Sequence, residues 1–291
     1  MRAVAPPGRW IWRLSGLITA ALLVFVAAHL IAKAGQPEYA QPRATTIRTV
    51  TVAQPVTSLT VQSYGGSVQI TGAPVDRVQI TETLMYNAPS GNLSAEPVAL
   101  PAGAPTMAQS VSGGHLSLGD PECASSNCSV SFAVTVPSAA TVSVDTEGGS
   151  ISVSGIAGAN LDSGGGPVNA TRIGGPLTVG TDGGSLQLTG LTGPLSADTG
   201  GGSLAALGVA SATATVTTGS GGASMIFSAA PDSVTVSTDG GSARLAVPGG
   251  PYALTADSDG GPQSIQITTS PAAQRSITVT SDGGPLVVGS R

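Results

Sequence analysis

Apolar and small polar residues alternate over most of the chain, in short segments that are separated by pairs of glycines. The alternation is clear in Ser150–Val153, Ser185–Leu188 and Ser242–Leu245, where every second residue is apolar. A period of two residues over such short stretches predicts a β-strand with one buried face. A second segment of this kind, such as Leu177–Val179 or Ile277–Val279, precedes the next glycine pair. The pattern therefore predicts an all-β protein whose repeating unit is strand, turn, strand, turn.

The glycine pairs recur at a nearly constant interval in residues 142–291. Between their first glycines the steps are 17, 18, 18, 20, 19, 20 and 23 residues. A period of this length indicates one supersecondary unit that stacks on its neighbours. The first glycines of the pairs are Gly148, Gly165, Gly183, Gly201, Gly221, Gly240, Gly260 and Gly283.

Two strands and two turns per unit predict one coil of a single-stranded parallel β-solenoid, a β-helix-like fold, with coils of about 17–20 residues. Glycine would supply turn conformations with positive φ, and an Asp, Ser or Thr before it would bond the backbone of the turn. The alternative is that the units are hairpins of a β-sandwich or barrel, which also has short strands at regular spacing. The uniform unit length and the repeated turn residues favour the solenoid.

Residues 47–141 carry the same alternation less regularly. It begins at residues 47–52, and an early copy of the repeat phrase follows at Gly65–Ile70. A stretch rich in Pro and Gly, residues 87–105, has no period and predicts a long surface loop. Because end coils must close the core differently, we expect residues 47–141 to form irregular first coils and residues 142–291 to form regular ones.

The N-terminal residues predict a membrane anchor. Residues 14–32 form an apolar run of 19 residues, long enough to cross a hydrocarbon core of roughly 30 Å as a helix. Arginines precede this run, so the positive-inside rule places residues 1–13 in the cytoplasm and exports the chain beyond the anchor. Residues 33–46 would then be a linker. The alternative is a signal peptide cleaved near Ala34, which would give a secreted protein.

Charge divides the chain at the same point. The first 34 residues hold four basic and no acidic side chains, whereas residues 35–291 hold seven Arg and all sixteen acidic residues. Nucleic acids and anionic membrane surfaces bind clusters of Lys and Arg. The acidic exported part therefore predicts no nucleic-acid partner, and contact with the membrane only through the single N-terminal helix.

The two cysteines of the chain, Cys123 and Cys128, lie on either side of a turn-forming run. In an exported segment, two such cysteines most simply form one local disulfide. Closing so short a loop is worth roughly 2 kcal/mol at most, so the bond would fix a loop more than it would stabilise the fold. The alternatives are a metal site, for which His115 is the nearest imidazole, or a redox pair, although redox pairs usually have C-x-x-C spacing.

The sequence offers little for catalysis, and we expect a non-enzymatic protein with no catalytic residues and no bound cofactor. A Ser-His-Asp site would have to use His115, the only His after the anchor, and no G-x-S-x-G motif occurs.

Seven aspartates recur near one turn of the repeat, and stacked coils would bring some of them into line. Asp beside two glycines is what a tight turn favours. The alternative is weak Ca²⁺ binding along an acidic ridge, although the spacing of known calcium loops is missing. These residues are Asp145, Asp162, Asp182, Asp198, Asp239, Asp259 and Asp282.

An N-terminal hydrophobic anchor, the segment Gly65–Ile70, the strand Phe132–Pro137 and serial glycine-pair coils come one after another in this chain. This order resembles the bacterial putative-adhesin family, a set of β-solenoid surface domains similar to the GIN-type head domains. The resemblance covers about residues 47–291. It implies a non-enzymatic role in the cell envelope, linked in some cases to adhesion or to sensing of envelope stress. The loop 87–105 and the cysteine pair depart from the family pattern.

We therefore expect a membrane-anchored, extracytoplasmic β-solenoid that binds a cell-wall polymer or an envelope protein. The binding surface would be a flat face of stacked Ser, Thr and Gln side chains. The alternative is an accessory protein that senses envelope stress and signals through its helix.

Overall fold

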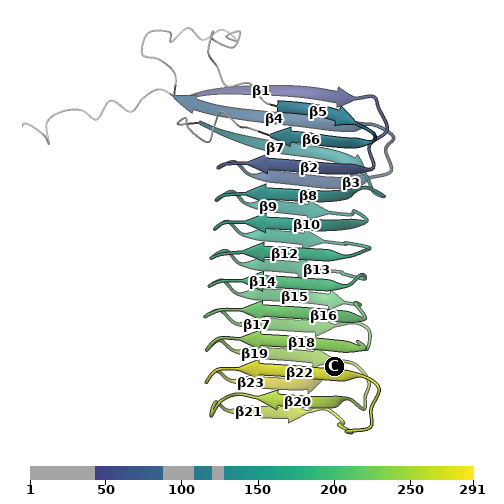
Figure 1. Cartoon of the computed structure of the whole chain (residues 1–291), viewed down its shortest axis with the longest axis vertical. Coiled ribbons are helices and arrows are strands. Elements are labelled where there is room, and N and C mark those ends of the chain that lie inside the picture. Colours follow the sequence, from purple (N-terminus) through teal and green to yellow (C-terminus); the bar gives the residue numbers. More distant parts are fainter. Residues whose placement is uncertain (1–42, 88–107, 120–127) are drawn as a thin grey trace, which may run out of the picture. The chain divides into compact units, whose positions relative to one another are not determined.

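The computed structural model describes residues 43–87, 108–119 and 128–291. The chain divides into two units, Met1–Pro42 and Arg43–Arg291, and all the described residues belong to the second. Their regular elements are all β-strands, which form two sheets (Figure 1). This result confirms the all-β prediction.

Sheet A has twelve strands and sheet B has eleven. In spatial order, sheet A consists of β1 (Arg43–Val52), β4 (Val78–Asn87), β7 (Cys128–Pro137), β3 (Val68–Ala73), β9 (Ile151–Ser154), β11 (Val168–Thr171), β13 (Leu186–Thr189), β15 (Leu204–Val209), β17 (Ala223–Phe227), β19 (Ala243–Val247), β23 (Leu286–Ser290) and β21 (Gln263–Gln266). Sheet B consists of β20 (Ala253–Asp257), β22 (Ser276–Ser281), β18 (Ser233–Thr238), β16 (Thr213–Thr218), β14 (Leu195–Thr199), β12 (Leu177–Thr181), β10 (Gly158–Ser163), β8 (Thr141–Thr146), β2 (Ser58–Ser63), β6 (His115–Gly119) and β5 (Ala108–Ser112).

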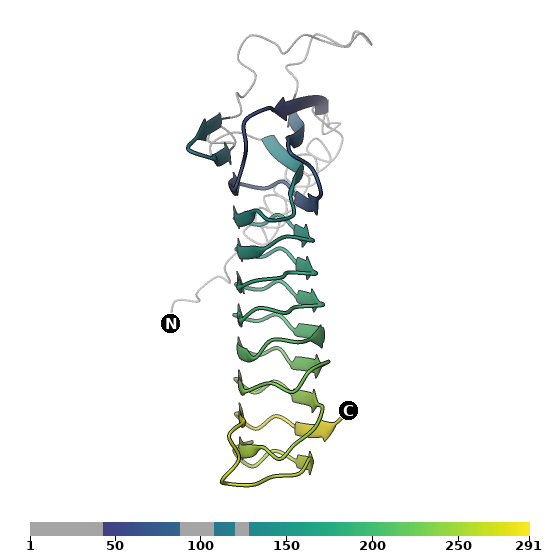
Figure 2. The same cartoon turned by 90° about the vertical axis from the view of Figure 1, so that its right-hand side faces the viewer.

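Each glycine-pair unit forms one coil that gives one strand to each sheet. From β8 to β19, even-numbered strands stack in sheet B, odd-numbered strands stack in sheet A, and neighbours run parallel. Leu161 of β10, for example, lies opposite Val144 of β8 and Val179 of β12. Figure 2 shows the two sheets as two columns of strands joined by the turns of successive coils. Parallel stacking fits the predicted β-solenoid and excludes hairpins for residues 141–247.

Because the stacked strands are in register, the inward apolar residues of successive strands form continuous rows between the two sheets. Leu161, Val179 and Leu188 point inward from three different strands, and each is at most 1% exposed. Full burial of an aliphatic side chain of this size contributes about 1.5–3 kcal/mol. Because one coil has only a few such side chains, each coil depends on its neighbours for stability.

Buried hydroxyl groups form a column in the turn that leads from sheet B to sheet A. A Ser or Thr ends or directly follows each sheet B strand of the coils, and a glycine lies three residues later. Thr181 is typical, because its Oγ1 accepts a hydrogen bond from the Gly184 N–H (3.0 Å) and donates one to the Gly166 carbonyl of the neighbouring coil (3.4 Å). This bonding confirms the predicted role of Ser and Thr in the turns. The buried hydroxyl residues are Ser63, Thr146, Ser163, Thr181, Thr199, Thr218, Thr238, Ser258 and Ser281.

The glycines of this column, which we call the column glycines, are required for a different reason from the expected one. Positive φ occurs at the preceding glycines Gly240, Gly260 and Gly283, but not at Gly184. A Cβ atom on Gly184 would instead overlap the carbonyl oxygen of Gly166, the column glycine of the preceding coil. The close approach of adjacent coils therefore excludes a side chain. The column glycines are Gly66, Gly149, Gly166, Gly184, Gly202, Gly221, Gly241, Gly284 and Gly261.

The last two coils are stacked in the opposite order to the sequence. β22 lies between β18 and β20, and β23 lies between β19 and β21 (Figure 1). The inserted coil turns Ile277, Val279, Leu286 and Val288 inward, and each is at most 1% exposed. The end coil places Gln263 opposite Leu286. The more apolar coil gains more from having neighbours on both sides, so the serial order expected from the repeat does not hold here.

The first coil, formed by β2 and β3, is also flanked by strands that come later in the chain. β6 and β7 stack on one side of this coil, and β8 and β9 stack on the other. Antiparallel pairs then extend both sheets: β4 pairs with β7, β1 pairs with β4, and β5 pairs with β6. Gly113 and Gly114 both have positive φ and form the two-residue turn between β5 and β6.

Several predictions fall partly or wholly outside the described residues. The anchor at residues 14–32, residues 88–105 of the predicted loop and Cys123 lie outside them, so the anchor, the loop and the disulfide stay predictions. The predicted loop 87–105 starts one residue too early, because Asn87 ends β4. The predicted linker 33–46 reaches too far, because β1 begins at Arg43. No helix with the length and apolarity to span a membrane occurs in the described ranges.

Candidate functional site

The outer face of sheet B carries a regular array of hydroxyl groups on three adjacent strands. β16, β18 and β22 each turn three Ser or Thr residues outward, while Ala, Val or Ile between them point into the core. The register places these residues opposite one another in three columns. We call the nine residues the hydroxyl array: Thr213, Thr215, Thr217, Ser233, Thr235, Ser237, Ser276, Thr278 and Thr280.

The spacing of the hydroxyl array follows from strand geometry. Neighbouring strands are roughly 4.8 Å apart, and residues on one face of a strand repeat at roughly 6.6 Å. Hydroxyl groups also bond to each other across the strands, since Ser276 Oγ donates to Ser233 Oγ and Thr280 Oγ1 donates to Ser237 Oγ, both at 3.2 Å. Each hydroxyl both donates and accepts hydrogen bonds. The array therefore presents a flat, uncharged surface with fixed polar groups.

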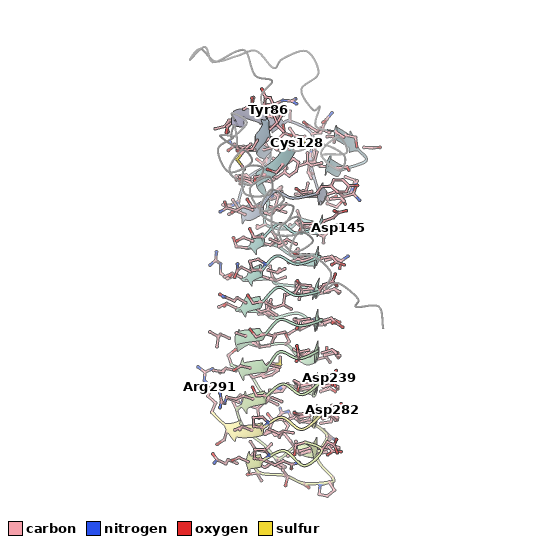
Figure 3. All side chains as sticks on the ribbon, turned by 90° about the vertical axis from the view of Figure 1, so that its left-hand side faces the viewer. Tyr86, Cys128, Asp145, Asp239, Asp282 and Arg291 are labelled. Atoms are coloured by element: carbon pink, nitrogen blue, oxygen red, sulfur yellow. The ribbon has the colours of Figure 1, made fainter. Side chains whose placement is uncertain are left out.

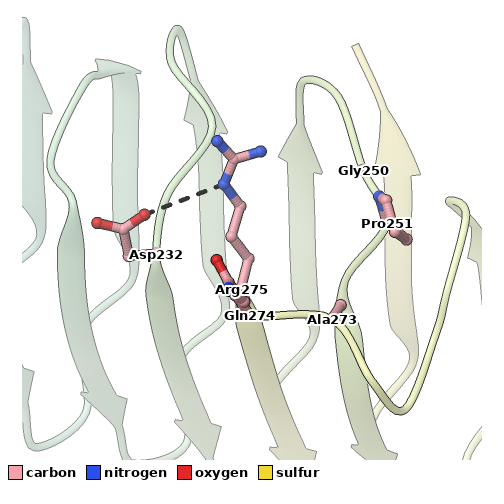
Figure 4. Close-up of a pocket in the computed structure, with 6 residues that line it drawn as sticks. All are labelled: Asp232, Gly250, Pro251, Ala273, Gln274 and Arg275. Carbon is pink, nitrogen blue, oxygen red and sulfur yellow. Dashed lines mark ion pairs between the residues drawn. The ribbon is translucent and has the colours of Figure 1, made fainter.

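A pocket of about 460 Å³ lies beside the array, at the start of the same strands (Figure 4). Three loops build it: Asp232 directly precedes β18, Gly250 and Pro251 precede β20, and residues 273–275 precede β22. The Nε atom of Arg275 lies 4.0 Å from Oδ1 of Asp232. The lining residues are Asp232, Gly250, Pro251, Ala273, Gln274 and Arg275.

Tyr252 stands next to the pocket residue Pro251 in the chain and is fully buried. Its hydroxyl donates a 2.6 Å hydrogen bond to the carbonyl oxygen of Pro248. Burial raises the pKa of the Tyr252 phenol, and the positive charge of Arg275 opposes this shift. The protonated hydroxyl thus fixes the loop between β19 and β20, which forms one wall of the pocket.

The seven aspartates lie along one edge of the stack, where the sheet B strands end. Figure 3 shows Asp145, Asp239 and Asp282 on one side and Arg291 on the other. Asp145 lies directly opposite Asp162 in the neighbouring strand. The stacking therefore aligns some of these residues, as expected. In the part of the chain that the structure describes, no group of three or more His, Cys, Asp or Glu is placed to hold a metal ion.

Two further residues were singled out from the sequence. His115 begins β6 on the surface, and its Nδ1 shares a 2.9 Å hydrogen bond with Oγ of Ser58 in β2. This contact fastens β6 to the first coil. Cys128 begins β7, and the described ranges do not include its expected partner.

One buried acidic residue, Glu82 of β4, was not singled out from the sequence, although it alternates in phase with Ile80 and Leu84. Its side chain is 1% exposed, and among the described residues its carboxylate has no hydrogen-bond partner. Nη1 of Arg48, on the neighbouring strand β1, lies 3.8 Å away. Burial raises the pKa of the Glu82 carboxyl, and Arg48 opposes this shift. Glu82 therefore carries an energetic cost at neutral pH.

Sequence reasoning predicted a flat face of stacked Ser, Thr and Gln side chains without assigning it to particular strands, and it missed the pocket. The outward Thr residues of Thr213–Thr218 are visible as a simple alternation with Ala and Val. Asp232, Gly250 and Arg275 come from three separate loops, and the inverted order of the last coils brings them together. No local pattern marks them.

The fold and the outer face define a class of protein, a stack of parallel coils with a polar surface sheet. No family model matches the chain, and no curated protein matches it. Among solved structures, the chain is similar to a "putative adhesin" from Bacteroides fragilis, with 15% identity and a TM-score of 0.43 over 86% of this chain and 99% of that one. It is also similar to a "putative cell adhesion protein" from Clostridium sporogenes, with 11% identity and a TM-score of 0.30 over 86% of this chain and 100% of that one. Both of these solved structures are named for adhesion.

Proposed function

We propose that this protein is a non-enzymatic surface binding module that holds the outer face of sheet B against an extended polymer of the cell envelope. The observation that carries the proposal is the register of the hydroxyl array, in which nine Ser and Thr side chains stand in three columns on three paired strands. A polymer with many hydroxyl groups offers matching donors and acceptors at repeated intervals.

The construction of the face supports binding without a large entropic cost. Val216, Val236 and Val279 lie on the inner side of the three strands and are at most 3% exposed, so the packed core holds the backbone of the face. Thr side chains are restricted at χ1. A preformed, rigid surface loses little conformational freedom when a ligand binds.

The same proposal includes the predicted membrane anchor. An anchored module would present its polar face at the outer surface of the membrane, where envelope polymers lie. The supporting observation is the apolar run at residues 14–32. Fractionation of cells that express the full chain, or a variant without residues 1–34, tests this part. Recovery of the full chain in the soluble fraction would contradict it.

Binding to isolated cell envelopes tests the central proposal. The purified full chain should sediment with envelopes, and Thr235→Leu should weaken this binding about tenfold or more, because it places a bulky side chain without hydrogen-bonding groups at the centre of the array. Gln187→Leu is the matched control, since Gln187 is exposed on the outer face of sheet A. Equal binding of the two variants, or no binding of the unaltered chain, would overturn the proposal.

A further inference from the structure

The pocket beside the hydroxyl array is continuous with it. Asp232 directly precedes Ser233, and Arg275 directly precedes Ser276. Ser233 and Ser276 lie opposite each other and form part of the first column of the array. A ligand polymer that lies on the array would therefore also reach the pocket, because the charged pocket residues directly precede the first residues of the array.

Backbone hydrogen bonds hold the charged residues of the pocket in place. The Ser276 N–H donates to the Asp232 carbonyl oxygen at 2.9 Å, and the Ala253 N–H donates to the Arg275 carbonyl oxygen at 2.8 Å. The Ala273 N–H closes the adjacent turn by donating to the Ser270 carbonyl oxygen at 3.0 Å. The backbone of both charged residues is therefore held in place, and Figure 4 shows their side chains directed toward one another.

The ion pair between these side chains leaves part of Arg275 unused. Its Nε atom faces Asp232 at 4.0 Å, and the two side chains are 44% and 71% exposed. Within the described part of the chain, no partner contacts Nη1 or Nη2 of Arg275. These two nitrogens form one edge of the planar guanidinium, which suits a planar carboxylate in a bidentate arrangement.

We propose that this pocket binds the carboxylate-bearing sugar of an acidic polysaccharide, while neighbouring sugars of the same chain lie on the hydroxyl array. The proposal rests on the proposed function, because it names the kind of polymer that the face recognises. A pocket of about 460 Å³ is within the usual size range of small-ligand sites.

The lining favours one planar anion with hydroxyl groups around it. Arg275 receives the carboxylate, and Asp232 and the Gln274 amide accept or donate hydrogen bonds to sugar hydroxyl groups. Pro251 and Ala273 offer apolar contact to the C–H groups of a sugar ring. The lining holds one cation and one anion, whereas phosphate sites usually gather several cations or backbone N–H groups.

Calorimetric titration of the full chain with an oligogalacturonate, and with the carboxyl-reduced oligomer of equal length, tests the proposal. The acidic oligomer should bind about tenfold or more tightly than the reduced one, and Arg275→Gln should remove this preference. Arg244→Gln, on the exposed outer face of sheet A, should leave both affinities unchanged. Because Arg275 is partly exposed, its variant should keep the melting temperature of the unaltered chain.

Three outcomes would overturn the proposal: no binding of the acidic oligomer, equal binding of the two oligomers, or an unchanged preference in Arg275→Gln. The envelope assay separates this failure from failure of the proposed function. If Thr235→Leu loses envelope binding and Arg275→Gln keeps the oligomer preference, the array functions and the pocket assignment is wrong. If the unaltered chain binds no envelope but shows the Arg275-dependent preference, the proposed function is wrong and the pocket assignment holds.

Discussion

The column glycines allow the packing of the coils to be tested with one methyl group. A Cβ atom on Gly184 would overlap the carbonyl oxygen of Gly166, whereas a Cβ atom on Gly183 would have nothing within 4 Å. Neither glycine has positive φ. Gly184→Ala and Gly183→Ala therefore add the same atom to adjacent residues, and only the first forces two coils apart.

The expected cost of Gly184→Ala is about 3 kcal/mol. Forcing a methyl group into a well-packed site costs about 1–3 kcal/mol. Separation of the coils also stretches the 3.4 Å hydrogen bond from Thr181 to Gly166. The added Cβ would lie 2.8 Å from Oγ1 of Thr181, so it disturbs the 3.0 Å bond from the Gly184 N–H as well, and each bond is worth about 1 kcal/mol. For a unit of this size, the melting temperature should fall by about 10 °C.

Thermal unfolding monitored by circular dichroism measures this difference. Gly183→Ala should leave the melting temperature unchanged or raise it slightly, because alanine reduces the freedom of the unfolded chain. Equal melting temperatures for the two variants would refute the argument that the distance between coils requires the column glycines.

Three further predictions concern buried groups, each read by urea or thermal unfolding. Burial places the pKa of Glu82 above its unfolded value, so its contribution to the unfolding free energy falls as pH rises from the unfolded pKa through the folded one. Glu82→Leu should therefore raise stability at pH 7 by about 1 kcal/mol or more and flatten the pH profile; lower stability at pH 7 would contradict this. Thr181→Val should lower the unfolding free energy by about 1–2 kcal/mol, because two hydrogen bonds are lost. Thr178→Val, on the exposed face of the same strand, should leave it unchanged. Equal losses for the two variants would exclude the hydroxyl column as a source of stability. Ile277→Ala should cost about 3 kcal/mol and Leu254→Ala clearly less, because the inserted coil buries Ile277 fully; the reverse order would indicate that the last coils stack serially.

The regular coils could be predicted because their information is local. The alternation in Leu177–Val179 and Ser185–Leu188 marks which residues face the core, and the period of the glycines marks where each coil ends. The role of Thr181 as a turn residue is also evident from its position before the glycines. The sequence does not show why residue 184 must be Gly. The reason is the short distance to Gly166 in the preceding coil, and neither residue specifies that distance.

The candidate site also has a part that could be predicted from the sequence and a part that could not. The outward residues of β16, β18 and β22 follow from alternation, so a hydroxyl-rich face was expected. The pocket was not, because Asp232 and Arg275 are far apart in the sequence and meet only when β22 is inserted beside β18. Glu82 was missed although a local signal marks it, because alternation in β4 places it on the same face as the buried residues Ile80 and Leu84.

By itself, the sequence determined the all-β class, the two strands of each coil and the residues that face the core, because strand periodicity and turn chemistry act over a few neighbouring residues. The tertiary structure decided which coil stacks on which. Stacking order depends on the apolar area that each coil buries between its neighbours, so the coil with Ile277 and Leu286 lies inside and the coil with Gln263 lies at the end. That choice also places Arg275 beside Asp232, and with them the pocket at the edge of the hydroxyl array.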